Sequence, residues 1–199
     1  LLIRWPGHVA PHSESSALVC GTDLGPTILE ACGMNPAGGM TGKSFIGELT
    51  GKRPADRSYV FAERGWHFGP ITRTDGLDFS RSITSTRYRY IYNALPERSY
   101  TPVDMADKDA WRAIQQAQAA GRLSPLHQRL YFQKPRPMTE LYDLQNDPFE
   151  LRNLSGNTST AETEDTLRKA LEIWMIHESD FLPLPTHAHQ TTIKKRSEE

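Results

Sequence analysis

Apolar residues in this chain recur at two spacings. Some stretches alternate apolar and polar positions, which is typical of strands, and others repeat every three or four residues, which is typical of helices. Residues 1–5 are a short apolar run that Pro6 and Gly7 end, so they predict a buried strand. In residues 22–32 the apolar positions share one side and Gly33 follows, so this stretch predicts a helix.

Three more stretches predict strands. Residues 58–63 are rich in aromatic and β-branched side chains, and residues 80–86 and 87–93 alternate on either side of a possible turn, which favours an antiparallel hairpin. One face of the second hairpin strand carries three aromatic side chains: Tyr88, Tyr90 and Tyr92. Such a stripe can stack sugars or bases, but it is more often a sheet face covered by a helix.

Residues 139–154 combine a strand with strong turn signals. Leu141 and its alternating neighbours predict a short half-buried strand, and the cluster from Asn146 to Pro148 ends it. Pro148 then favours a helical turn, for which Leu151 and Leu154 supply an apolar edge. The stretch is interpreted as a structural clasp, because no His or Cys stands beside its carboxylates.

Two helices are predicted in the second half of the chain. One covers residues 107–120 and ends at Gly121, after which several prolines indicate an extended path along the surface. The other begins at a capping box of Ser159 and Glu162. Its apolar stripe is expected to cover the hairpin and the Leu141 strand, and it consists of Leu167, Ala170, Leu171 and Trp174. Residues 183–199 are expected to form a mobile tail.

Composition indicates an incomplete core. Only 37% of the 199 residues are apolar, which is low for a self-contained globule of this length. The 23 basic and 24 acidic residues balance, so no overall field attracts nucleic acid or an acidic membrane. No apolar run approaches the 18 or so residues of a membrane span. Because the sequence opens on an apolar run without Met, we expect it to be the C-terminal part of a longer protein.

The two cysteines are not expected to pair. Cys20 and Cys32 stand at opposite ends of a predicted helix that spans roughly 15 Å, whereas a disulfide needs Cα atoms within about 7 Å. Both are interpreted as buried, small apolar residues, and two unpaired thiols do not indicate a redox compartment.

The strongest chemical cluster follows the predicted 58–63 strand. Glu63, Arg64 and His67 place a carboxylate, a guanidinium and an imidazole within five residues, and together they could bind a polar anionic ligand. The plainer interpretation is a surface loop with a local salt bridge.

Four motifs then agree in order with one protein family. They are R-W-P-G with D-L-G-P-T-I-L, M-T-G-K-S-F, the R-S-I-T-S-T-R-Y-R-Y-I-Y-N hairpin, and E-L-Y-D-L-Q-N-D-P-F-E-L-R-N-L. Together they resemble the C-terminal portion of type I, formylglycine-dependent sulfatases. Within that family, the heparan N-sulfatase (sulfamidase) group is the most similar in motif order.

This resemblance implies an α/β protein, the C-terminal end of an alkaline-phosphatase-like sulfatase domain followed by a small antiparallel sheet packed by a C-terminal helix. The expected division is residues 1–79 for the end of the catalytic domain, residues 80–182 for the small sheet subdomain, and residues 183–199 for the tail. The missing N-terminal part of the catalytic domain is an expected partner. Family members are periplasmic, secreted or lysosomal, so the compartment stays open.

The implied activity is hydrolysis of sulfate esters or sulfamates, with a sulfated sugar, favourably a glycosaminoglycan, as substrate. Glu63, Arg64 and His67 are then the expected substrate contacts. The formylglycine comes from the Cys of a C-x-P-S-R motif, but Cys20 precedes G-T-D-L and Cys32 precedes G-M-N-P. The nucleophile and the calcium ligands are therefore expected upstream, and no catalytic residue or metal ligand is assigned to this chain.

Two other functions remain open. A phosphoester or phosphonate hydrolase of the same superfamily would differ in its upstream nucleophile. A non-catalytic binding module would retain the sugar-facing loop alone.

Overall fold

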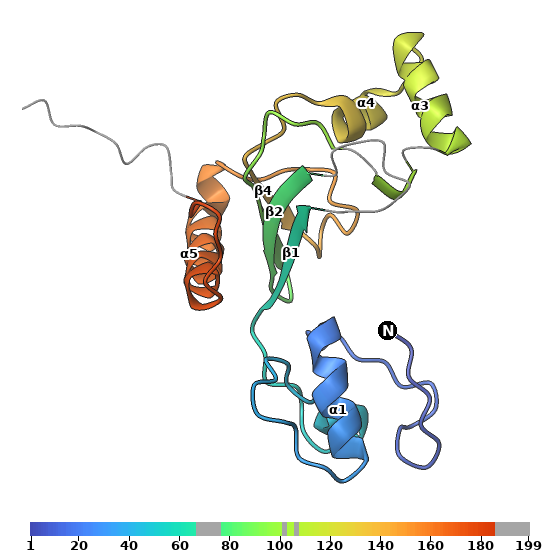
Figure 1. Ribbon diagram of the computed structural model, residues 1–199, viewed down its shortest axis with the longest axis vertical. Helices are drawn as coiled ribbons and strands as arrows, with labels where there is room; N and C mark the ends of the chain where they lie inside the picture. Colours follow the sequence, from blue (N-terminus) through green and yellow to red (C-terminus); the bar gives the residue numbers. More distant parts are fainter. Residues whose placement is uncertain (67–76, 101–102, 106–107, 186–199) are drawn as a thin grey trace, which may run out of the picture.

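The computed structural model describes residues 1–66, 77–100, 103–105 and 108–185. Figure 1 shows two parts, which we call the N-terminal lobe (residues 1–57) and the sheet unit (residues 60–185). The lobe contains the short 3-10 helix η1 (Gly21–Asp23), α1 (Leu24–Ala31) and α2 (Ile46–Leu49). The sheet unit contains β1 (Val60–Trp66), β2 (Leu77–Thr84), β3 (Tyr88–Asn93), η2 (Val103–Met105), α3 (Asp109–Ala119), α4 (Pro125–Phe132), β4 (Thr139–Asp143), η3 (Thr158–Thr160) and α5 (Ala161–His177).

The four strands form one antiparallel sheet in the order β1-β2-β3-β4. Ile83 of β2 faces Tyr90 of β3, which in turn faces Leu141 of β4, so the three strands place apolar side chains on one face. The predicted hairpin and the Leu141 strand are confirmed. Strand β1 begins and ends later than the predicted 58–63 strand, and it pairs with β2.

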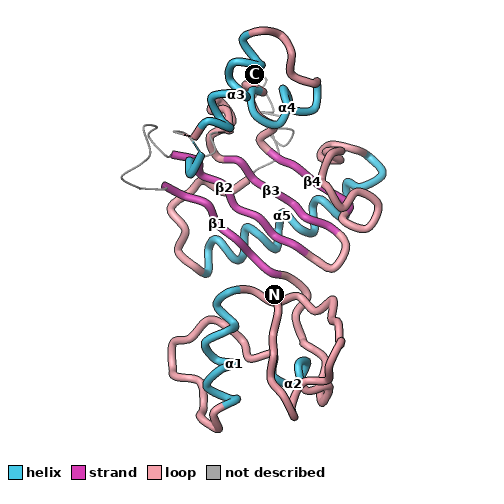
Figure 2. The backbone as a smooth tube through the Cα atoms, turned by 90° about the vertical axis from the view of Figure 1, so that its right-hand side faces the viewer, coloured by secondary structure: helices cyan, strands magenta, loops and turns pink. Residues whose placement is uncertain are grey.

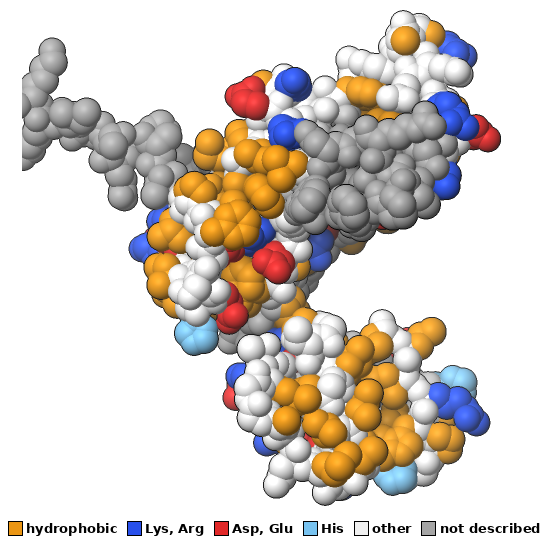
Figure 3. Space-filling model, in the orientation of Figure 1, with side chains coloured by type: hydrophobic (Ala, Val, Ile, Leu, Met, Phe, Trp, Pro, Cys, Tyr) orange, Lys and Arg blue, Asp and Glu red, His pale blue; other side chains and the backbone are white. Residues whose placement is uncertain are grey.

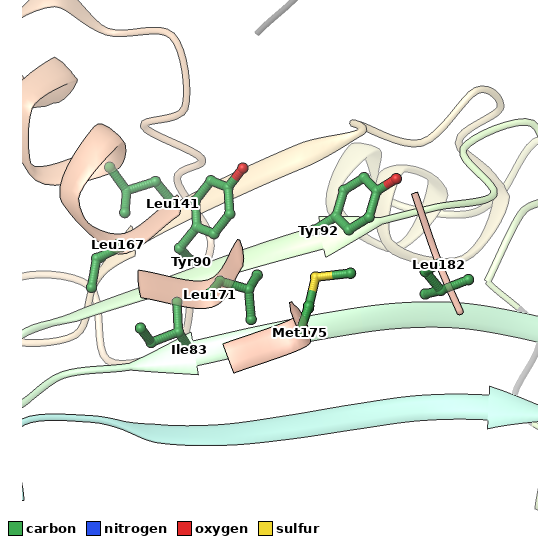
Figure 4. Close-up of a cluster of buried hydrophobic side chains, with 8 residues drawn as sticks. All are labelled: Ile83, Tyr90, Tyr92, Leu141, Leu167, Leu171, Met175 and Leu182. Atoms are coloured by element: carbon green, nitrogen blue, oxygen red, sulfur yellow. The ribbon is translucent and has the colours of Figure 1, made fainter. Parts of the chain in front are cut away.

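The core of the sheet unit lies between this face and α5 (Figure 2). Figure 4 shows the buried side chains, which are Ile83, Tyr90, Tyr92, Leu141, Leu167, Leu171, Met175 and Leu182. Phe61 of β1 stacks on Trp174 of α5 with ring centres 5.0 Å apart and extends the core to the edge strand. The prediction that α5 covers the tyrosine face is confirmed.

The clasp at residues 139–154 covers the free edge of β4. The Asn153 side chain accepts a hydrogen bond from Leu141 N at 2.9 Å and donates one to Thr139 O at 3.2 Å, and Leu154 N donates to Leu141 O at 2.8 Å. Asn153 thereby takes the place of a neighbouring strand and satisfies backbone groups that an open edge would expose.

The helical turn predicted after Pro148 is wrong. Glu150 has φ 56, a left-handed conformation that ends a helix rather than starting one. The side chain of Asp147 accepts hydrogen bonds from Leu151 N at 3.0 Å and Arg152 N at 2.8 Å. This carboxylate satisfies the backbone donors that a helical turn would have used, so the segment closes as a loop.

The N-terminal lobe is organised around the buried carboxylate of Asp23, which is 1% exposed. It accepts hydrogen bonds from Cys20 N and Lys43 N, each at 2.8 Å, and from the Arg57 guanidinium at 2.7 Å. Gly42 lies so close to this centre that a Cβ there would be 2.0 Å from Thr22 O, which explains a glycine at that position. The predicted 22–32 helix is confirmed as η1 followed by α1.

The predicted capping box of Ser159 and Glu162 is wrong, because Thr160 is the N-cap of α5 and makes no side-chain cap hydrogen bond. Three other sequence-based predictions fail in the structure. Residues 1–5 form no strand, and Leu2 is fully exposed, because an apolar run becomes a strand only beside a hydrogen-bonded neighbour. Cys20 and Cys32 are unpaired as expected, but Cys20 is half-buried and Cys32 is exposed. The path after Gly121 is not wholly extended, since Pro125 begins α4, where a proline is tolerated in the first turn.

The predicted helix over residues 107–120 is confirmed as α3. Most of the expected tail, residues 186–199, lies outside the described residues. No helix in the described part of the chain is long and apolar enough to cross a membrane.

Candidate functional site

The three predicted substrate contacts do not form one cluster among the described residues. Glu63 and Arg64 lie within β1 rather than in a loop after it, so their side chains point to opposite faces of the sheet. Glu63 is opposite Arg81 of β2, and Arg64 is opposite Ser80. His67, the third member, lies outside the described residues. The two faces must therefore be considered separately.

On the α5 face, Glu63 stands at the rim of a buried ion pair. Arg81 is 3% exposed, and it donates from Nε to Asp180 Oδ2 at 2.5 Å and from Nη2 to Oδ1 at 3.0 Å. Glu63 Oε2 lies 3.7 Å from Arg81 Nη2, while its side chain remains 69% exposed. The hydrogen bonds from Arg81 lower the pKa of Asp180 against the opposing effect of burial.

This pair fixes the end of α5 to the sheet. Arg81 also donates from Nη1 to the backbone oxygens of Arg64 and Ser80, both at 2.9 Å. With all these donors engaged inside the protein, Arg81 has a structural role. The carboxylate of Glu63, by contrast, is exposed on this face.

On the other face, Arg64 belongs to a cluster of two guanidiniums and one carboxylate. Asp78 Oδ2 lies 3.2 Å from Arg64 Nε, and Asp78 Oδ1 accepts from Arg136 Nη2 at 2.5 Å. The Arg64 guanidinium also lies over the ring of Tyr100, 5.0 Å from its centre. Asp78 and Arg136 are nearly buried, whereas the Arg64 side chain is 35% exposed.

This arrangement orients Arg64, whose side chain remains partly exposed. The carboxylate on one side and the aromatic ring on another restrict its rotamers, which lowers the entropic cost of binding. A guanidinium held in this way can donate to a sulfate or carboxylate group. The geometry therefore preorients Arg64 on the face away from α5.

Sequence reasoning missed the three residues that orient Arg64. Asp78 could have been found, because it lies two residues before Ser80 in β2 and therefore on the same face of the sheet, and Ser80 is opposite Arg64. Arg136 and Tyr100 carried no local signal, since they come from irregular segments distant in sequence from β1.

A cavity of about 440 Å³ lies in the N-terminal lobe, among residues that include Val19, Lys43, Phe45 and Arg53. Neither Glu63 nor Arg64 lines it. Across the described residues, no three His, Cys, Asp or Glu side chains are grouped so that they could hold a metal ion.

Comparison with known proteins now assigns the family. Residues 1–110 match the family model "N-sulphoglucosamine sulphohydrolase, C-terminal". The chain belongs to this family. It is thus a C-terminal portion of a type I sulfatase, as the motif order predicted.

Two curated relatives, both ulvan-active sulfatases of Formosa agariphila, are similar over nearly the whole chain. One is 30% identical over 93% of this chain and 30% of its own length, and the other is 31% identical over 90% of this chain and 33% of its own length. The sulfatase C-terminal chain described here therefore spans about a third of the relatives it matches.

Solved sulfatases share the fold. A 2-O GAG sulfatase superposes with a TM-score of 0.51 at 18% identity, covering 79% of this chain and 25% of that one. The putative sulfatase yidJ from Bacteroides fragilis gives 0.52 at 16% identity, covering 88% and 29%. These neighbours confirm the expected fold class, an alkaline-phosphatase-like α/β sulfatase with a small antiparallel sheet packed by a helix.

Proposed function

We propose that this chain is the C-terminal part of an enzyme that hydrolyses sulfate esters or sulfamates on a sulfated sugar. The observation that supports this is the family match over residues 1–110 together with two sulfatase relatives aligned over at least 90% of the chain. The relatives are named for activity on ulvan, a sulfated polysaccharide. Glycosaminoglycans remain the substrate class that the motif comparison favours.

The bond-breaking groups are proposed to lie upstream. Neither Cys20 nor Cys32 stands in a C-x-P-S-R motif, so the formylglycine would come from residues that precede Leu1. Calcium would bind there too, as the resemblance to type I sulfatases implies. The formylglycine residue would supply the nucleophile, and bound calcium would polarise the sulfate group.

The residues of this chain would bind and orient the sugar. Arg64 would donate to an anionic group, since Asp78 and Tyr100 hold its guanidinium in place. Glu63, on the other face of β1 from Arg64, would accept hydrogen bonds from hydroxyl groups of the sugar. His67 would also contact the sugar. These three roles stay proposals.

The test uses the complete coding sequence, expressed with the formylglycine-generating enzyme. Sulfate release from heparan sulfate, chondroitin sulfate and ulvan is measured by ion chromatography, with phosphate and phosphonate monoesters as competing substrates. We expect release from at least one glycan and none from the isolated 199 residues. Faster hydrolysis of the phosphorus esters would support the rival hydrolase, and binding without hydrolysis would support the binding module.

Arg64→Lys sharpens this test. The substitution keeps the charge but loses the planar donor pair, so we expect a higher KM with little change in kcat. An unchanged KM at an unchanged melting temperature would remove Arg64 from the substrate contacts.

A further inference from the structure

The segment that contains α3 and α4 differs in charge from the rest of the chain. Residues 108–136 hold six Lys and Arg side chains but a single acidic one, Asp109. The whole chain, by contrast, is balanced at 23 against 24. The family match ends at residue 110, so nearly all of this segment lies beyond it. Five of the six basic side chains are exposed, whereas Arg136 is nearly buried in its ion pair with Asp78. A local basic surface therefore exists at one end of the sheet unit.

Aromatic rings connect this surface to Arg64. His127 and Tyr131 lie one turn apart on α4, with ring centres 6.4 Å apart and planes 21° from parallel. Tyr100 follows at 6.4 Å from Tyr131, and the Arg64 guanidinium lies 5.0 Å from the centre of Tyr100. The rings thus form a row from the exposed side of α4 to the residue that the proposed function assigns to the substrate.

Buried contacts between α3 and α4 hold this row in position. Trp111 of α3 is 7% exposed, stacks on Phe132 at 5.7 Å, and meets the edge of Tyr131 at 5.8 Å. The Ser124 hydroxyl caps α4 by accepting a hydrogen bond from His127 N at 3.3 Å. The half-buried rings of Tyr100 and Tyr131 and the exposed ring of His127 are therefore positioned before any ligand arrives, which reduces the entropy lost on binding.

Two cations flank α4 without acidic partners in the part of the chain that the structure describes. Arg122 precedes the helix and Lys134 follows it, and both side chains are exposed. Figure 3 shows Lys and Arg side chains around this end of the molecule. We call Tyr100, Arg122, His127, Tyr131 and Lys134 the α4 platform.

We propose that the α4 platform binds a sulfated polysaccharide chain beyond the sugar that reacts at the catalytic centre. The proposal rests on the proposed function for its substrate class and adds that the substrate is a polymer. Pyranose rings pack on aromatic faces, and Arg122 and Lys134 attract the sulfate groups of neighbouring sugars. The spacing favours a glycan over nucleic acid. The two cations stand at the ends of an eight-residue helix that is about 12 Å long. This separation suits the widely spaced sulfate groups of a polysaccharide better than the phosphates of duplex DNA, which carries one negative charge per about 1.7 Å of its axis.

The experiment compares dextran sulfate with uncharged dextran as probes for the 199-residue chain, by affinity electrophoresis at several salt concentrations. The double variant Arg122→Gln/Lys134→Gln removes two exposed charges. We expect it to bind dextran sulfate about fivefold more weakly, the effect of losing two exposed ionic contacts. The matched control, Lys52→Gln/Arg53→Gln, removes two exposed charges from the N-terminal lobe and should retain the original affinity.

Tyr131→Leu tests the aromatic row separately from charge. It should weaken dextran sulfate binding while leaving the salt dependence unchanged, and Tyr131→Phe should restore the affinity. The proposal would be overturned if the platform variant and the lobe control lost the same affinity for dextran sulfate. It would also be overturned if uncharged dextran bound as tightly as dextran sulfate. Displacement of dextran sulfate by a DNA duplex at lower concentration would assign the platform to nucleic acid instead.

The complete enzyme separates this proposal from the proposed function. The Arg122→Gln/Lys134→Gln variant should release sulfate from a polysaccharide more slowly and from a sulfated monosaccharide at the original rate. Equal rates on both substrates would refute the platform while the sulfatase assignment stands. No sulfate release by any version would refute the proposed function, and the electrophoresis would still decide the platform.

Discussion

The N-terminal lobe and the sheet unit are stabilised by different interactions. In the sheet unit, one continuous apolar cluster joins α5 to three strands, and Ile83, Tyr90 and Leu171 in it are fully buried. Within residues 1–57, Phe45 is the large apolar side chain that is buried, and the centre of the lobe is the Asp23 carboxylate. Ile28, on α1, is 61% exposed.

The difference shows that a hydrogen-bonded carboxylate can define a local fold that has little apolar core. Such a fold has a small apolar area removed from water, so it opens at a lower free energy than the sheet unit. Leu1 and Leu2 of the lobe are likewise largely exposed. Four experiments test this contrast.

The largest effect is expected from the core of the sheet unit. Leu171→Ala removes a side chain with 0% exposure and leaves a cavity between α5 and β3, which should lower the free energy of unfolding by about 4 kcal/mol. Ile173→Ala, on the exposed side of the same helix, should cost less than about 1 kcal/mol. Urea denaturation followed by circular dichroism measures both, and similar losses would show that α5 is not a core helix.

The next effect should be confined to the lobe. Asp23→Ala leaves the Arg57 guanidinium without its carboxylate partner and two backbone donors unpaired, which should destabilise α1 by about 3 kcal/mol. Native-state hydrogen exchange should show faster exchange in α1 with unchanged protection in β2 and β3. Glu30→Ala, at an exposed position of α1, is the control. Equal acceleration in both parts would mean that lobe and sheet unit unfold together.

A smaller loss is expected at the clasp. Asn153→Ala exposes the backbone groups of Leu141 and Thr139 on the edge of β4, at a cost of about 2 kcal/mol. The exposed Gln145, changed to Ala, serves as the control. Thermal melting detects the difference, and a null result would reassign the edge protection to Leu154 alone.

The smallest loss of stability is expected from protonating single carboxylates at low pH. The pKa of Asp143 is lowered, first by hydrogen bonds from Arg87, and hydrogen bonds from Arg81 likewise lower the pKa of Asp180. A lowered folded pKa means fewer protons bound in the folded state, so this stabilisation is complete well above 3.8 and declines as the pH falls below it.

Stability measured by urea denaturation from pH 7 to pH 2 checks this sign. Asp143→Asn should flatten the acid side of the profile, because the substituted side chain no longer titrates. A stability maximum below pH 3 would contradict the assignment.

The pattern of apolar and polar residues predicted much of the fold. The alternation in residues 87–93 predicted β3 and its buried tyrosines, and the stripe at Leu167 and Leu171 predicted which side of α5 is covered. The motif order predicted the family that the comparison confirmed. These features are local or repeat along one element, so the sequence expresses them directly.

The candidate site was predicted less well. Glu63 and Arg64 were named, but the strand was expected to end at Glu63, and it continues to Trp66. That extension places the two side chains on opposite faces, because successive residues of a strand alternate. The partner that orients Arg64 across the sheet, Asp78, is fixed by the pairing of β1 with β2.

The sequence by itself determined the elements, the family and the covered face of the helix, since each depends on periodicity or on a contiguous motif. Only the tertiary structure decided that Arg81 is buried beneath α5, that Asn153 substitutes for a strand, and that a row of rings leads to Arg64. Those outcomes depend on which distant backbone segments become neighbours, and that choice is made by the packing of the whole chain rather than by any one stretch of it.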